Sequence, residues 1–140
     1  MSNLKAFFAQ NAKTEIVDEV IVSDRFKDEH GKPIPWKVRA ITEAENEQLR
    51  KASTQFVKGP GGRRTAEIQP DVYMAKVVVA SVVFPDLKNA ELQKSYGVIG
   101  AEDLLKKMLL SGEYARLVQA VQEINGFDKD INELMDEVKN

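Results

Sequence analysis

The residue types that most often carry catalysis or bind metals are scarce in this sequence. Its 140 residues include no cysteine and a single histidine, His30. Without cysteine there is no thiolate nucleophile, no thiolate ligand for a metal and no disulfide. Residues 28–33, which contain His30, have the composition of a polar turn, and no second histidine completes the spacing of a zinc site. A serine nucleophile would likewise lack a histidine base. We therefore interpret His30 as an exposed turn residue.

Adjacent carboxylates are the next candidates, and they occur at Asp18/Glu19, Asp28/Glu29 and Glu102/Asp103. Paired acids hydrolyse glycosides when a desolvating pocket raises the pKa of one of them. Each of these pairs is predicted in a strand, a turn or a helix start, where solvated acids are common. The sequence thus predicts no catalytic residue, no metal ligand and no cofactor site, and the protein is not expected to be an enzyme.

Residues 58–64, Lys-Gly-Pro-Gly-Gly-Arg-Arg, invite comparison with a phosphate-binding loop. They lack the Gly-Lys-Ser/Thr ending of that motif, and no clear strand precedes them. Glycine loses more backbone entropy on ordering than any other residue, so we predict a flexible loop over residues 58–65. The alternative is a basic contact loop for an acidic partner or a phosphate backbone.

Length and charge limit the class of protein further. A chain of 140 residues that is 43% hydrophobic supports one core, so a single domain over residues 1–140 is predicted. The 20 Lys and Arg against 22 Asp and Glu give a net charge of -2, which does not attract nucleic acid. The most apolar run, residues 77–84, is far shorter than the roughly 20 residues of a membrane span. Neither nucleic acid nor a membrane is an expected partner.

The elements that must form the fold can be read from hydrophobic periodicity. Trp36, Val38 and Ala40 alternate with charged residues, and residues 16–22 alternate similarly, which predicts a β-hairpin over residues 14–41 with the Trp36 face buried. Two strands alone are only marginally stable, so a helical bundle over residues 42–140 is expected to cover them. The predicted fold class is mainly α (α+β): an N-terminal β-hairpin packed on a bundle of five to six helices.

Helix boundaries follow from capping and length. Thr42 and Glu45 have the spacing of a capping box, which predicts a helix to about residue 54 whose apolar stripe includes Phe56. The length of the apolar segment between residues 70 and 85 favours a central helix, although its valines taken alone favour a strand. Ser111 is expected to cap a helix that ends before Gly126, and Gly126 is expected to have the left-handed backbone conformation common just after a helix. The predicted core contains Val78, Val79, Val82, Leu105, Leu117 and Val121.

The last two predicted helices, residues 113–125 and 128–138, carry the apolar stripes that best suit a binding surface. Such stripes usually face the core of the protein. This small domain has several of them, however, and an uncovered stripe would suit recognition of a partner protein. The predicted partner-binding residues are Tyr114, Leu117, Val121, Ile131, Leu134, Met135 and Val138.

Three parts of the sequence carry a family resemblance: residues 4–8 (Leu-Lys-Ala-Phe-Phe), residues 36–42 (Trp-Lys-Val-Arg-Ala-Ile-Thr) and residues 110–117 with residues 124–127. In this order they resemble the XkdN-like tail assembly chaperones of phages and phage-like prophage elements, over nearly the whole length. The resemblance implies a chaperone of the host bacterial cytoplasm that keeps the tape measure protein soluble during tail tube assembly and is absent from the mature virion. The tail tube protein is a second partner that the resemblance leaves open.

Two other functions are compatible with the sequence. A structural tail or head-completion protein that stays in the virion would also be small, acidic and without catalytic groups. A small helix-turn-helix DNA-binding regulator is compatible with a break at residues 111–112 between two helices. The second of these helices exposes glutamates and glutamines against one cation, Arg116, and so suits phosphate contact poorly. Self-association into a homo-oligomer stays open.

Overall fold

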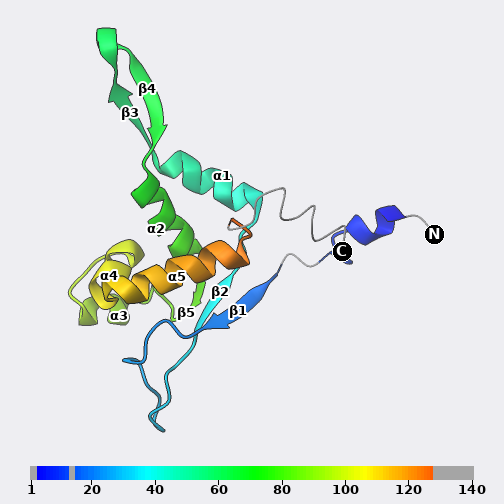
Figure 1. The fold of residues 1–140 in the computed structure, drawn as a ribbon, viewed down its shortest axis with the longest axis vertical. Helices are drawn as coiled ribbons and strands as arrows, with labels where there is room; N and C mark the ends of the chain where they lie inside the picture. Colours follow the sequence, from blue (N-terminus) through cyan, green and yellow to red (C-terminus); the bar gives the residue numbers. More distant parts are fainter. Residues whose placement is uncertain (1–2, 13–14, 128–140) are drawn as a thin grey trace.

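The structure, a computed structural model, describes residues 3–12 and 15–127. Figure 1 shows its elements, which are η1 (Asn3–Phe7), β1 (Val17–Val20), β2 (Trp36–Arg39), α1 (Glu43–Ala52), β3 (Thr54–Lys58), η2 (Pro60–Gly62), β4 (Arg64–Ile68), α2 (Pro70–Ser81), β5 (Val82–Phe84), α3 (Ala90–Ser95), α4 (Ala101–Met108) and α5 (Ser111–Ile124). Two of them, η1 and η2, are 3-10 helices. The predicted α+β class, with an N-terminal hairpin beside helices, is confirmed.

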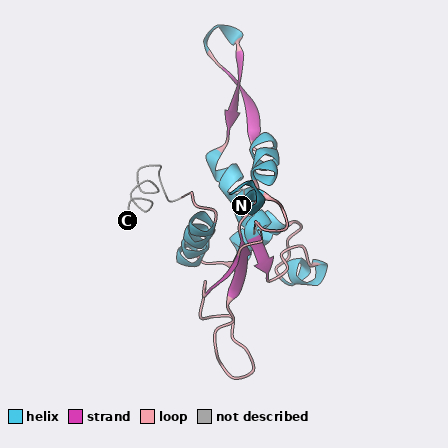
Figure 2. Cartoon of the chain, turned by 90° about the vertical axis from the view of Figure 1, so that its right-hand side faces the viewer, coloured by secondary structure: helices cyan, strands magenta, loops and turns pink. Residues whose placement is uncertain are grey.

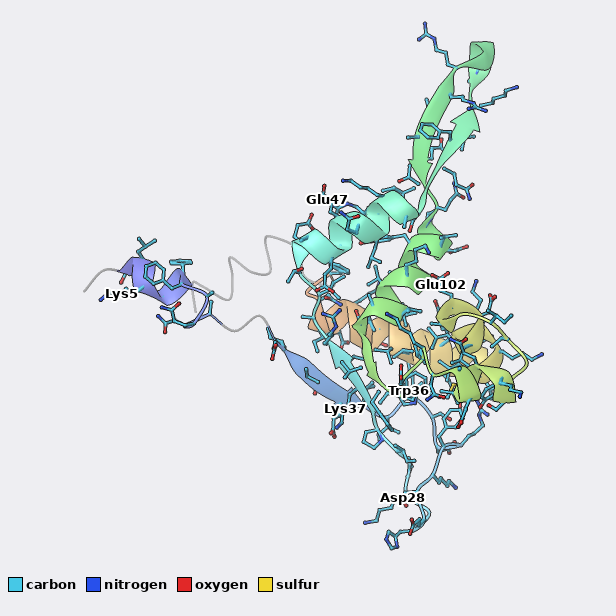
Figure 3. The ribbon with its side chains drawn as sticks, turned by 180° about the vertical axis from the view of Figure 1, so that it is seen from behind. Lys5, Asp28, Trp36, Lys37, Glu47 and Glu102 are labelled. Carbon is cyan, nitrogen blue, oxygen red and sulfur yellow. The ribbon has the colours of Figure 1, made fainter. Side chains whose placement is uncertain are left out.

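The N-terminal hairpin forms as predicted and becomes part of a three-stranded sheet of order β1-β2-β5. Strands β1 and β2 are antiparallel, with Val17 opposite Arg39 and Val20 opposite Trp36. Trp36 is 2% exposed and Val38 1%, so the predicted face is the buried one. Figure 3 shows the long β1–β2 connection carrying Asp28 away from the helices. The sheet therefore presents one face to the core.

The central helix is shorter than the sequence predicts. It begins at Pro70 but ends at Ser81, and Val82–Phe84 pair with β2 as a strand. The expectation of a helix reaching residue 84 is therefore wrong at its C-terminal end. The β-branched side chains of Val82 and Val83 favour an extended backbone. The neighbouring strand β2 supplies the hydrogen-bonding partners that make this conformation stable.

Helix α2 is central, as its apolar composition predicts, because it contacts α1, α4, α5 and β5. Val77 and Val78 are fully buried. The buried hydrophobic cluster comprises Val22, Trp36, Val38, Val77, Val78, Leu87, Leu104, Leu105, Met108, Leu109, Leu117 and Val121. Four of the six predicted core residues belong to it, and Val79 and Val82 are partly buried against it.

A second hairpin, β3–β4, is absent from the sequence-based prediction. Helix α1 ends at Ala52, and Phe56, predicted on its apolar stripe, lies in β3 and is 72% exposed. The strands pair from Thr54 opposite Ile68 to Lys58 opposite Arg64. Figures 1 and 2 show this hairpin extending away from the helices and the three-stranded sheet. We call residues 54–68 the arm.

Local capping explains where α1 and α5 begin. The Thr42–Glu45 capping box forms as predicted, with both reciprocal hydrogen bonds present. Ser111 does not cap α5, which corrects the sequence prediction: Ser111 is its first helical residue, and the carboxylate of Glu113 instead accepts the N–H of Leu110 at 2.8 Å. At the other end Gly126 has the positive φ, 76°, predicted for it.

Candidate interaction surface

The histidine and the paired acids that the sequence offers as catalytic candidates do not come together in one site among the described residues. His30 is exposed in the β1–β2 connection, and Glu102 forms an ion pair with Lys76 at 3.0 Å. Within residues 3–12 and 15–127, no group of three or more histidine or acidic residues could hold a metal ion. In the same part of the chain, none of the helices combines the length and the apolar character needed to cross a membrane.

The structure separates the predicted partner-binding residues into three groups. Leu117 and Val121 are fully buried, so their side chains pack inside this chain and are inaccessible on the folded surface. Tyr114 is half-buried at the edge of the core. The remaining four, Ile131, Leu134, Met135 and Val138, lie outside the described residues. Of the described three, only Tyr114 is positioned to contact a partner without a change in the fold.

Tyr114 lines an open groove of about 560 Å³ between α2, α4 and α5. The groove combines the apolar side chains of Met74 and Val118 with polar groups at its edges, among them Asp71 and Lys106. Burial is the main cause that raises the pKa of Tyr114, and the negative charge of Asp71 adds to it. The hydroxyl is therefore neutral at physiological pH and can donate or accept a hydrogen bond.

Helix α5 is anchored by a buried carboxylate. Glu113 accepts hydrogen bonds from the Ser23 hydroxyl and from the Arg25 guanidinium, whose Nη2 lies 2.5 Å from Oε1. Arg25 Nη2 also donates to the Met108 carbonyl at 2.9 Å. Hydrogen bonding by Arg25 is the main cause that lowers the pKa of Glu113 to about 2. The network ties the β1–β2 connection to the end of α4 and the start of α5, two of the helices that line the Tyr114 groove.

A second ion pair fixes α1. Arg39 Nη2 lies 2.6 Å from Glu45 Oε2, and Arg39 Nε donates to the Ala80 carbonyl at 3.1 Å. Hydrogen bonding by Arg39 lowers the pKa of Glu45 to about 2. One arginine thus links β2, the capping box of α1 and the end of α2. The arm, which leaves the end of α1, starts from a fixed position.

The base of the arm is closed, while its strands are exposed. Gln69 donates its N–H to the Ser53 carbonyl at 2.9 Å, and Ser53 is 1% exposed. Beyond this point Phe56 and Ile68 are 72% and 45% exposed. The predicted flexible loop, residues 58–65, forms the tip, where Gly61 and Gly62 have positive φ. Its mobility stays a prediction.

The sequence contains a signal for the arm that our reasoning missed. Two five-residue runs, residues 54–58 and 64–68, flank the glycine-rich residues 59–63 and include the β-forming residues Thr54, Phe56, Val57, Thr65 and Ile68. Glycines between two such runs are typical of a hairpin. The spacing of Phe56 also continues the apolar stripe of the preceding helix, so periodicity alone does not distinguish a helix from a strand at this residue.

The helix-turn-helix alternative finds little support in this geometry. Arg116, the one cation on α5, donates from Nε to the Val22 carbonyl at 3.1 Å. That contact holds the guanidinium beside β1 and the start of its connection to β2. A recognition helix needs cations directed outward to phosphates.

Comparisons with known protein families, sequences and structures all point to the same family. Residues 4–139 match the family described as phage XkdN-like tail assembly chaperone protein. The chain is 31% identical over 123 residues to the phage-like element PBSX protein XkdN of Bacillus subtilis (strain 168), covering 87% of this chain and 83% of that protein. It is 33% identical over 123 residues, with the same coverage, to the uncharacterized protein YqbN of the same strain. A crystal structure of YqbN superposes with a TM-score of 0.79 at 29% identity, covering 91% of this chain and 99% of that one.

Proposed function

Because the chain belongs to the phage XkdN-like tail assembly chaperone family, we propose that it binds the tape measure protein of its phage or prophage and keeps it soluble during tail assembly. The family match across residues 4–139 is the observation that carries this proposal. Tail assembly chaperones are a non-catalytic kind of protein. We place the activity in the host bacterial cytoplasm and the protein outside the finished virion, with the tail tube protein as a further partner.

The proposed mechanism requires only competition for apolar surface. A chaperone of this kind keeps its client soluble when its contacts with the client replace contacts between client molecules. The described surface offers exposed apolar side chains for that purpose, including Ile16, Val17, Ile21, Phe56, Ile68 and Ile99. Release follows when tube subunits bind the client more tightly, so no nucleotide is needed.

We propose that the groove beside Tyr114 is one client-binding region, together with the predicted stripe of Ile131, Leu134, Met135 and Val138. The half-buried tyrosine combines an apolar ring with a polar hydroxyl, a combination common in protein interfaces. Met135 adds a flexible side chain that adapts to different partners.

Co-expression tests the proposal. The tape measure gene encoded beside this chain is expressed alone, with the wild-type chain and with the Leu134→Asp, Val138→Asp double variant. We expect the soluble fraction of the tape measure protein to rise with the wild type and to fall again with the variant. The control variant, Lys129→Asp with Asn140→Asp, introduces one carboxylate on the predicted outer face of this helix and one after its predicted end, and it should behave like wild type.

Two outcomes would contradict the proposal. Equal solubility of the tape measure protein with and without this chain, and no complex in gel filtration, would exclude the chaperone function. Recovery of the chain in purified particles by mass spectrometry would instead favour a structural tail or head-completion protein.

A further inference from the structure

The arm has two faces of different character. Opposed residues of an antiparallel pair lie on the same face, and successive residues of a strand alternate between faces. The register therefore places three opposed pairs on one face. From the base of the arm to its tip they are Thr54 and Ile68, Phe56 and Ala66, and Lys58 and Arg64. Gln55, Val57, Thr65 and Glu67 form the other face. One face thus carries an apolar stripe that ends in two cations, and the carboxylate of the arm lies on the opposite face.

The cations at the tip are placed where folding does not require them. Lys58 and Arg64 are directly opposite each other, and like charges in that position destabilise a hairpin. Within residues 3–12 and 15–127, neither of them nor Arg63 forms an ion pair with a carboxylate. Anionic groups from a partner would remove this repulsion. The tip is therefore electrostatically complementary to an acidic partner, although the whole chain has a net charge of -2.

The strands of the arm also offer free backbone groups. A two-stranded sheet has two open edges, each with unpaired N–H and C=O groups that an extended segment can bind as a third strand. Phe56, 72% exposed, lies in the middle of β3. Figures 1 and 2 both show the outer part of the arm extending beyond the helices, whereas its base joins α1 and α2.

We infer that the arm docks an extended acidic segment of the client protein. The segment's apolar side chains cover Phe56 and Ile68, and its carboxylates face Lys58 and Arg64. This inference rests on the proposed function, because the client is the protein that the chain is proposed to keep soluble. It adds where and how the client binds: a client segment adds as a β-strand to the edge of the arm. The arm selects segments in which aliphatic residues are flanked by Asp or Glu.

Peptide binding by the full chain tests the inference. Overlapping synthetic peptides of the neighbouring tape measure protein serve as probes, and the retained peptides should be enriched in carboxylates beside aliphatic residues. For the tightest peptide, Lys58→Glu with Arg64→Glu should raise the Kd by about tenfold or more, as expected when charges of the correct sign are reversed. A peptide with its carboxylates replaced by lysine should regain affinity for that variant. The affinity of the wild type should also fall with added salt.

Matched controls separate the arm from general effects of charge and hydrophobicity. Lys27→Glu with Lys32→Glu makes the same change in net charge on the exposed β1–β2 connection and should leave the Kd unchanged. Phe56→Ser should weaken binding, whereas Val57→Ser on the other face should not. A variant in which a short Gly-Ser linker replaces residues 55–67 keeps the Ser53–Gln69 closure and should retain the thermal unfolding midpoint reported by Trp36 fluorescence.

The outcomes distinguish this inference from the proposed function. If the wild type retains neither peptides nor the intact tape measure protein, the proposed function fails, and the inference fails with it. If the wild type and the armless variant retain the client equally, the inference is overturned while the proposed function stands. Loss of duplex DNA binding or of self-association in the armless variant, with client binding intact, also overturns the inference.

Discussion

The sequence predicts Leu117 both in the core and in the partner-binding surface, and the two roles predict opposite effects of its substitution on the free energy of unfolding. It lies on α5, is fully buried and belongs to the central hydrophobic cluster. Replacing a closed leucine with alanine removes the transfer free energy of its side chain and leaves a cavity, at a cost of about 2 to 5 kcal/mol. For a chain of this length, with total stability of roughly 7 to 20 kcal/mol, the Leu117→Ala variant should still fold.

Urea unfolding measures this cost. Trp36 is the single tryptophan and is 2% exposed, so its fluorescence reports loss of the core. With a urea dependence of about 2 kcal/mol per molar, the unfolding midpoint should fall by roughly 1 to 2.5 M. The matched control is Leu110→Ala, because the Leu110 side chain is 60% exposed. The hydrogen bond that Leu110 donates to Glu113 comes from its backbone N–H and is kept in the alanine variant. That control should change the free energy of unfolding by no more than about 0.5 kcal/mol.

Equal, small effects of the two substitutions would refute the burial argument. If Leu117→Ala left the free energy of unfolding unchanged but abolished client binding, Leu117 would be a partner contact, and the binding surface on α5 would include it.

The remaining predictions concern charge and the arm. The folded-state pKa values of Glu113 and Glu45 are lowered to about 2, so the stability they contribute should be fully present above about pH 5 and lost as pH falls toward 2. Glu113→Gln should lower stability at pH 7 and flatten this dependence in urea titrations at several pH values; a profile parallel to wild type would contradict the assignment. Replacing residues 59–62 by Asn-Gly should change stability by less than about 1 kcal/mol, because loop-closure entropy varies slowly with length. Hydrogen exchange at residues 58–65 should be fast in the free protein, and a loss of several kcal/mol on shortening would mean that the tip is packed.

The features predicted correctly from the sequence depend on interactions between near neighbours. The Thr42–Glu45 capping box and the left-handed Gly126 each need only a few consecutive residues. Alternation around Trp36 predicted the first hairpin and its buried face for the same reason. The resemblance to XkdN-like tail assembly chaperones, based on residues along nearly the whole chain, agrees with the family that residues 4–139 match.

Tertiary structure decided the rest, because burial and strand pairing involve residues far apart in the chain. Val82 to Phe84 become a strand because β2 lies beside them, although residues 70–81 before them are helical. The stripe of Leu117 and Val121 looks the same whether α2 or a partner covers it, and only the packed fold places it inside. Phe56 fits a helical stripe and a strand equally well by spacing. Its pairing opposite Ala66 makes it a strand residue and leaves it exposed on the arm.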